Sequence, residues 1–158
     1  MNTRTEIVDE IRQAFEDTPY PGDDFLVDPP KGYENRDFDT IAEAFRGKSW
    51  QSLSDDFLLK YSEGISLLSP QGLRYFLPAY LIFGLSKSSR VQEGLVSSLT
   101  PKFEGILHEY FMERARVFTP AEKKAISLSL EYLYEEDKNY WESEPPDIRD
   151  AIRFWSGD

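Results

Sequence analysis

The chain has 158 residues, with 29 acidic against 18 basic side chains and a formal net charge of −11. This charge argues against a general nucleic-acid binder, because the affinity of such proteins comes largely from Lys and Arg side chains that neutralise phosphates. It also argues against binding to anionic membrane surfaces. The absence of cysteine excludes disulfides and cysteine-type zinc sites and fits a reducing cytoplasm. At this length one domain buries about two-thirds of its unfolded surface, which is enough for a core without such cross-links.

The first predicted element is an amphipathic helix over residues 3–15. Thr3 and Glu6 have the spacing of a capping box, and apolar residues then recur at helical spacing along one side. The segment lacks the long apolar run of a signal peptide, so we expect a cytoplasmic protein.

A long connector follows over residues 17–35 and contains two proline turns. A loop of this length is uncommon inside a compact domain, so residues 1–16 could form an N-terminal arm. The connector carries Asp23, Asp24 and Asp28, which could bind a hard cation such as calcium. Their spacing is not that of an EF-hand, so we favour a solvated acidic loop, which is also a candidate contact for a basic partner.

Two short helices are predicted next, over residues 37–46 and 55–62. Gly47 and Gly64 are placed to end them, and Ser54 is placed to cap the second. Apolar residues at helical spacing in the first helix indicate that it packs one side against a core.

Residues 67–85 form the most apolar stretch of the chain. Ser69 can cap a helix, and Pro70 suits the first turn, where its missing N–H has no partner to lose. Pro78 then interrupts the pattern, which predicts either a kink or two short helices. A membrane span needs about 20 apolar residues, and polar side chains interrupt this run. We therefore expect the stretch to form the core against which the other helices pack.

The predicted core residues of this stretch are Arg74, Tyr75, Pro78, Tyr80 and Leu81. Arg74 is its only formally charged residue and has two interpretations. It could contact an anion or a substrate, or it could bury its stem and pair with a carboxylate. Because the chain offers so many acids, we favour the structural role.

Four helices are predicted in the C-terminal half. They cover residues 89–99, a segment that begins at Pro101, residues 119–136 and residues 147–155. The third has the clearest start, because Thr119, Pro120 and Glu122 supply a cap, a first-turn proline and a capping-box glutamate.

A resemblance to a known family rests on the block LSPQGLRYFLPAYL, which follows Trp50 and Leu53 and precedes FTPAEKKAISLSLEYL. These residues resemble small bacterial proteins known only as a domain of unknown function, in which a Leu-Ser-Pro-x-Gly/Ala-x-Arg-Tyr-Phe/Tyr-Leu-Pro-Ala block recurs. The resemblance covers residues 50–134 and implies a helical bacterial domain without an assigned activity. Some similar small proteins accompany bacterial toxins as immunity proteins, which is an association and not a motif match.

No arrangement of residues in the sequence predicts catalysis. His108, the only histidine, follows Glu104 by one turn and could exchange a proton with it. No recognisable serine or cysteine nucleophile accompanies the pair, so we favour a surface histidine. One histidine without an HExxH pattern predicts no zinc site, and isolated glycines predict no phosphate loop. We expect neither a metal nor a cofactor.

A second acidic cluster is interleaved with aromatic residues near the C-terminus. Its candidate partner-binding residues are Glu135, Glu136, Asp137, Tyr140 and Trp141. Aromatic side chains can anchor a protein partner while charges steer it, so this segment is a candidate binding face. The alternative is a fraying helix end whose aromatic side chains pack back on the core.

These features predict an all-α, single-domain orthogonal bundle over residues 1–158, with about seven helices around the proline-interrupted helix. The predicted function is a non-enzymatic interaction protein that binds a basic protein partner, of which an immunity or antitoxin-like role is one form. Two alternatives stay open: a small-ligand binder or hydrolase-type enzyme with an acidic pocket near Arg74, and a structural subunit of a larger assembly. The negative charge also has a plainer explanation, because many cytosolic bacterial proteins are acidic.

Overall fold

The computed structural model describes residues 2–86, 89–102, 104–143 and 147–157, and every regular element within them is helical. The nine α-helices of this part are α1 (Arg4–Phe15), α2 (Arg36–Phe45), α3 (Asp55–Lys60), α4 (Pro70–Gly84), α5 (Ser89–Leu99), α6 (Gly105–Ala115), α7 (Pro120–Glu136), α8 (Lys138–Ser143) and α9 (Ile148–Ser156). Short 3-10 helices join some of them: η1 (Asp23–Phe25), η2 (Trp50–Ser52) and η3 (Gly64–Leu67). The predicted all-α class is confirmed.

The helix number differs from the prediction of about seven, chiefly because of α8, whose segment reads in the sequence as a polar connector. Asp137 caps this helix, since its Oδ1 accepts the Tyr140 N–H at 3.2 Å, and Trp141 is buried in the core. A cap and one buried aromatic side chain can hold a helix that is too short to show apolar periodicity.

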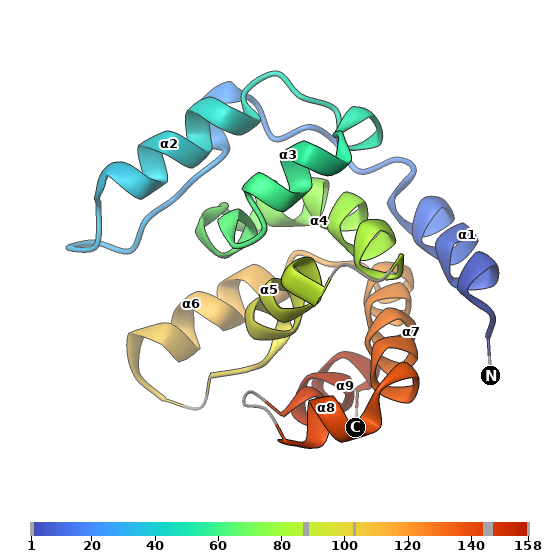
Figure 1. The fold of residues 1–158 in the computed structure, drawn as a ribbon. Helices are drawn as coiled ribbons and strands as arrows, with labels where there is room; N and C mark the ends of the chain where they lie inside the picture. Colours follow the sequence, from blue (N-terminus) through green and yellow to red (C-terminus); the bar gives the residue numbers. More distant parts are fainter. Residues whose placement is uncertain (1, 87–88, 103, 144–146, 158) are drawn as a thin grey trace.

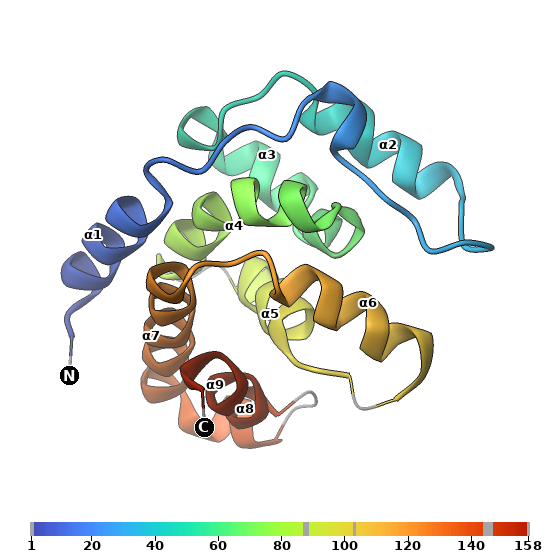
Figure 2. The same cartoon turned by 180° about the vertical axis from the view of Figure 1, so that it is seen from behind.

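The helices form two groups with α4 between them (Figure 1, Figure 2). α2 and α3 cover one side of α4, α5 to α9 lie on the other, and α1 runs beside both α4 and α7. α4 contacts α1, α3, α5 and α6, while α7 packs against both α1 and α9. Because Ile7, Ile11 and Phe15 of α1 are buried, this helix is part of the core and not a separate arm.

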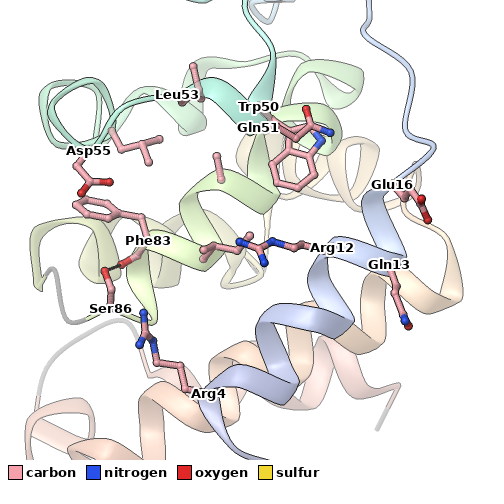
Figure 3. Close-up of a pocket in the computed structure, with 13 residues that line it drawn as sticks. Arg4, Arg12, Gln13, Glu16, Trp50, Gln51, Leu53, Asp55, Phe83 and Ser86 are labelled. Atoms are coloured by element: carbon pink, nitrogen blue, oxygen red, sulfur yellow. Dashed lines mark hydrogen bonds between the residues drawn. The ribbon is translucent and has the colours of Figure 1, made fainter.

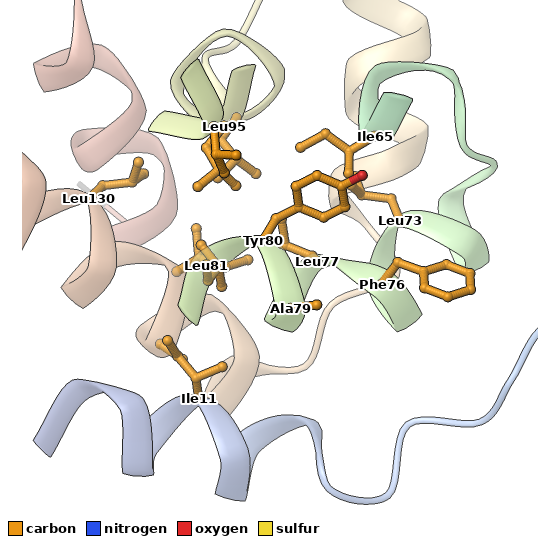
Figure 4. Packing of buried hydrophobic residues seen from close by; sticks show 14 of the residues in the cluster. Ile11, Ile65, Leu73, Phe76, Leu77, Ala79, Tyr80, Leu81, Leu95 and Leu130 are labelled. Atoms are coloured by element: carbon orange, nitrogen blue, oxygen red, sulfur yellow. The ribbon is translucent and has the colours of Figure 1, made fainter. Parts of the chain in front are cut away.

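α4 is one continuous helix although Pro78 lies inside it, so the two-helix alternative is wrong. The predicted core residues Tyr75, Pro78, Tyr80 and Leu81 are all buried. Tyr80 and Leu81 lie at the centre of the packed side chains, with Leu77 beside them (Figure 4). Proline removes a hydrogen bond from a helix interior, but tertiary packing supplies most of a helix's stability in a protein.

The hydroxyl of Tyr80 is a polar group of the core that has a hydrogen-bond partner. It is fully buried and donates to the Tyr61 carbonyl at 2.7 Å. Burial raises the pKa of this hydroxyl, so it stays protonated as a donor. Across the described residues, no buried side-chain nitrogen or oxygen lacks a hydrogen-bond partner.

Ser69 ties the start of α4 to the long connector. Its hydroxyl oxygen accepts the Gly72 N–H at 2.9 Å, as a helix cap, and its hydroxyl donates to the Phe25 carbonyl at 2.6 Å. Its backbone N–H donates to the Leu26 carbonyl at 2.8 Å, beside one isolated antiparallel bridge. The connector is therefore fixed to the core at this point.

Arg114 of α6 holds the residues just before α4, and sequence reasoning missed it. Its buried guanidinium donates to the carbonyls of Ile65, at 2.6 Å, and of Leu68. Tyr110, one turn earlier, accepts a third hydrogen bond at 3.2 Å. Burial lowers the pKa of this guanidinium, and no carboxylate in the described part of the chain forms an ion pair with it. Carbonyl groups at the end of a 3-10 helix compensate its charge instead.

Gly72 tests the junction between α4 and the connector, because a Cβ atom there would stand 2.8 Å from the Leu26 carbonyl oxygen. In an open helix, replacing glycine by alanine stabilises. Here we predict that Gly72→Ala lowers the free energy of unfolding by about 1–3 kcal/mol, as over-packing does elsewhere. Urea denaturation followed by circular dichroism measures the change.

Gln71→Ala is the matched control for this change, because Gln71 is exposed and lies in the same turn of α4. It should alter the free energy of unfolding by less than about 0.5 kcal/mol. A stabilising Gly72→Ala would contradict the close approach of the connector.

Candidate functional site

The predicted acidic residues of the connector do not gather into one site. Asp23 accepts the Tyr20 hydroxyl at 2.5 Å and pairs with Arg46 at 3.6 Å. Asp24 and Asp28 are exposed. Within the described ranges, no group of three or more His, Cys, Asp or Glu side chains could hold a metal ion. The connector acids therefore lie in a solvated loop that is fixed by Asp23 to the end of α2.

Four residues predicted in the C-terminal cluster do meet at one hollow, of about 310 Å³, between α5, α7 and α8. They are Glu136, Asp137, Tyr140 and Trp141. The other lining residues are Leu85, Gln92, Tyr132 and Leu133. Glu135 is not among them and pairs instead with Lys138 at 3.2 Å.

Tyr140 lies between this hollow and a second one of about 350 Å³, which is also lined by residues of η3 and α5. Its hydroxyl donates to Glu93 and its N–H donates to Asp137. Trp141 is only 4% exposed, so this aromatic residue packs back on the core and is not available as a surface anchor. Of the two aromatic residues predicted to bind a partner, Tyr140 is the one that reaches the surface.

We call this surface the Tyr140 face and define it as Tyr140 with the acids that line the two hollows, namely Glu63, Glu93, Glu136 and Asp137. None of these acids forms an ion pair with a lysine or arginine that the structure describes. Arg90 is the cation among the described lining residues. Four acids against one cation leave the described lining of the two hollows with a net negative charge.

A larger groove, of about 670 Å³, lies between α1, α3 and α4 (Figure 3). Its apolar lining consists of Trp50, Leu53, Leu58, Ala79, Ile82 and Phe83. Arg4 and Arg12 of α1 line it as well, together with Gln51, Asp55 and Ser86. We call it the α1–α4 groove. Sequence reasoning missed it, because its residues come from separate segments that only the packing of α1 on α4 brings together.

Arg74 contacts a carboxylate, which is the contact expected from the structural one of its two interpretations. Its Nε donates to both carboxylate oxygens of Glu122, at 2.9 and 3.1 Å. The same carboxylate accepts the Thr119 N–H at 2.8 Å, within the capping box of α7, and the Thr18 hydroxyl at 3.0 Å. The side chain of Arg74 is 25% exposed and that of Glu122 is 1% exposed. The pair therefore joins α4 to α7 at the edge of the core through the Nε of the Arg74 guanidinium.

His108 is bound to the loop that precedes α6. Its Nδ1 lies 2.5 Å from the Lys102 carbonyl oxygen, an acceptor, so we assign the ring proton to Nδ1. No hydrogen bond joins His108 to Glu104 in the described structure. The histidine thus holds the first turns of α6 against the loop.

The link between Arg74 and Glu122 predicts energetic coupling. Changing Arg74 leaves the nearly buried Glu122 carboxylate without its cation, and changing Glu122 leaves the guanidinium without its anion. We predict that Arg74→Met lowers the free energy of unfolding by about 2–3 kcal/mol, less than for a fully buried pair because Arg74 is partly exposed. In a double-mutant cycle with Glu122→Gln, the interaction energy should be at least about 1 kcal/mol. Urea denaturation of the four proteins measures it.

The matched control is the exposed pair of Arg46 and Asp23, which are 3.6 Å apart. The cycle of Arg46→Met and Asp23→Asn should give an interaction energy below about 1 kcal/mol. An equal or larger interaction energy in this control cycle would mean that the contact of Arg74 with Glu122 is not a structural link.

Three comparisons with known proteins bear on the identity of the chain. No curated protein and no solved structure matches it. Within the described ranges, no helix is both long and apolar enough to cross a bilayer. Residues 3–158 match the family of unknown function DUF6714. Since this match covers nearly the whole chain, the protein belongs to DUF6714, and its resemblance to an uncharacterised family is confirmed.

Proposed function

We propose that this chain is a non-enzymatic interaction protein that binds a basic protein partner through the Tyr140 face. The observation that carries the proposal is the set of acids around Tyr140 that lack a cationic partner among the described residues. Uncompensated carboxylates on one face attract a basic surface and speed its approach. The net charge of −11 adds to the same field.

Tyr140 would give such a partner a fixed contact. Its ring packs edge to face on Trp141, with the ring centroids 4.9 Å apart. Its hydroxyl donates to Glu93 and its backbone N–H donates to Asp137, so the side chain is positioned before a partner arrives. A preorganised tyrosine loses little conformational entropy on binding, and the hollows on either side could admit lysine or arginine side chains.

An immunity or antitoxin-like role is one form of this function, with a basic toxin as the partner. The cytoplasm is our proposed place for the encounter, since a chain without cysteine suits a reducing compartment. A structural subunit of a larger assembly would use the same face in a permanent contact. The alternative of a ligand or hydrolase site near Arg74 has less support, because Glu122 already binds that guanidinium.

The proposal predicts that the triple variant Glu93→Gln, Glu136→Gln and Asp137→Asn loses affinity for the partner. Each change removes a charge, and positions 93 and 137 keep a side-chain oxygen that can accept the hydrogen bonds of Tyr140. A photoreactive residue in place of Glu63 would first capture the partner in cells, and mass spectrometry would identify it. With the purified partner, calorimetry at low salt should then show binding weakened at least about tenfold, with a flatter salt dependence.

The matched control is the triple variant Glu43→Gln, Glu109→Gln and Glu113→Gln, which removes three exposed acids from α2 and α6. It should leave the affinity within about threefold of the original, since distant exposed charges are largely screened. Equal losses in both variants would show that overall charge, and not the Tyr140 face, mediates binding. Capture of a partner without a basic surface would also contradict the proposal.

A further inference from the structure

We infer that the α1–α4 groove is a second binding site, which takes a small organic anion with an apolar body. The ligand class is a carboxylate or phosphate ester attached to an aromatic or branched hydrocarbon group. This site is separate from the Tyr140 face and shares no residue with it. It also has a different arrangement of charge, because two arginines, Arg4 and Arg12, line it as well as two acids, Glu16 and Asp55.

Two arginines of α1 supply the positive charge. Arg4 and Arg12 are eight positions apart, so they stand about 12 Å from each other along one side of the helix. Arg12 extends from α1 toward α4, and Arg4 extends toward Ser86 at the end of α4 (Figure 3). Although the chain has 29 acidic residues, neither guanidinium forms an ion pair or a hydrogen bond with a side chain that the structure describes.

The two acids that line the groove form no ion pair with Arg4 or Arg12, so the arginine charges are available to a ligand. Glu16 lines the groove at the end of α1, and its side chain is directed to the opposite side of the helix from that of Arg12 (Figure 3). Asp55 lies across the groove from α1 and forms no ion pair with Arg4 or Arg12. Guanidinium groups bind carboxylates and phosphates with two parallel hydrogen bonds, so these side chains suit an anionic head group.

Trp50 lines the same groove and carries an indole N–H, a hydrogen-bond donor. The residue is only 6% exposed, and its indole N–H has no acceptor among the described residues. In that part of the chain, every fully buried side-chain nitrogen has a hydrogen-bond partner. The Trp50 N–H has none, so it is accessible to solvent. A buried tryptophan usually finds a partner for its N–H, and an anion in the groove would provide one.

The remaining lining suits an apolar body. Leu53, Ile82 and Phe83 are partly exposed at the groove, while Leu58 and Ala79 form its buried side. A volume of about 670 Å³ is within the range of small-molecule sites. Apolar walls with a few donors on one side would fix a ligand by its charge and bind it by its hydrocarbon surface.

The test follows the Trp50 indole N–H in ¹H–¹⁵N spectra, with the resonance assigned by Trp50→Phe. The probes are 4-phenylbutyrate, phenyl phosphate, neutral 4-phenylbutanol, inorganic phosphate and a pentaglutamate peptide. Both aromatic anions should shift the resonance saturably, and the neutral alcohol and inorganic phosphate should bind at least about tenfold more weakly. The double variant Arg4→Gln and Arg12→Gln should weaken the aromatic anions at least about tenfold.

The matched control is Arg36→Gln with Arg116→Gln, which removes two exposed arginines outside the groove and should leave the affinity unchanged. Equal binding of the alcohol and the acid would overturn the proposal, because the arginines would then play no part. An unshifted Trp50 resonance with both aromatic anions would overturn it as well. A shift caused by pentaglutamate alone would assign the groove to an acidic peptide instead.

Discussion

The burial of α4 on several sides at once is the constraint on which the rest of the structure depends. A helix that is enclosed by other helices cannot turn its polar end groups to water, so these groups need partners within the protein. Ser69 caps the helix and also binds the connector. Arg114 binds the carbonyls that end the preceding 3-10 helix, and Glu122 binds Arg74 on the flank of α4. The Phe25 carbonyl, Arg114 and Glu122 come from distant segments, so enclosing α4 also fixes the connector, α6 and α7.

These contacts give the central sequence block a structural explanation. Gly72 allows the connector to approach, Arg74 joins α4 to α7, and Tyr80 fills the core while its hydroxyl binds a carbonyl. The side chains that one would first inspect for chemistry are therefore already engaged in the fold. Charged groups that form no ion pair among the described residues lie instead on the surface, where acids surround Tyr140 and two arginines line the α1–α4 groove.

Local signals in the sequence were sufficient for most of the fold, because helix starts depend on residues only three or four positions apart. The capping boxes that begin at Thr3 and Thr119 are both present as predicted. Interactions between distant segments were not accessible in this way. Nothing near Arg114 indicates that its guanidinium binds carbonyls more than forty residues earlier. The α1–α4 groove was not predicted for the same reason. The Tyr140 face was partly predicted, because Glu136, Asp137 and Tyr140 are close in sequence.

The most direct test of the central role of α4 is native-state hydrogen exchange of its backbone amides. If the helix is enclosed as described, the amides of Leu77, Tyr80 and Leu81 exchange only when the whole domain unfolds. Their exchange free energies should then equal the free energy of unfolding from denaturant titration and match those of Ile126 and Leu130 in α7. Exchange of the α4 amides at a clearly lower free energy than those of α7 would contradict the account, because α4 would then open without disrupting its neighbours.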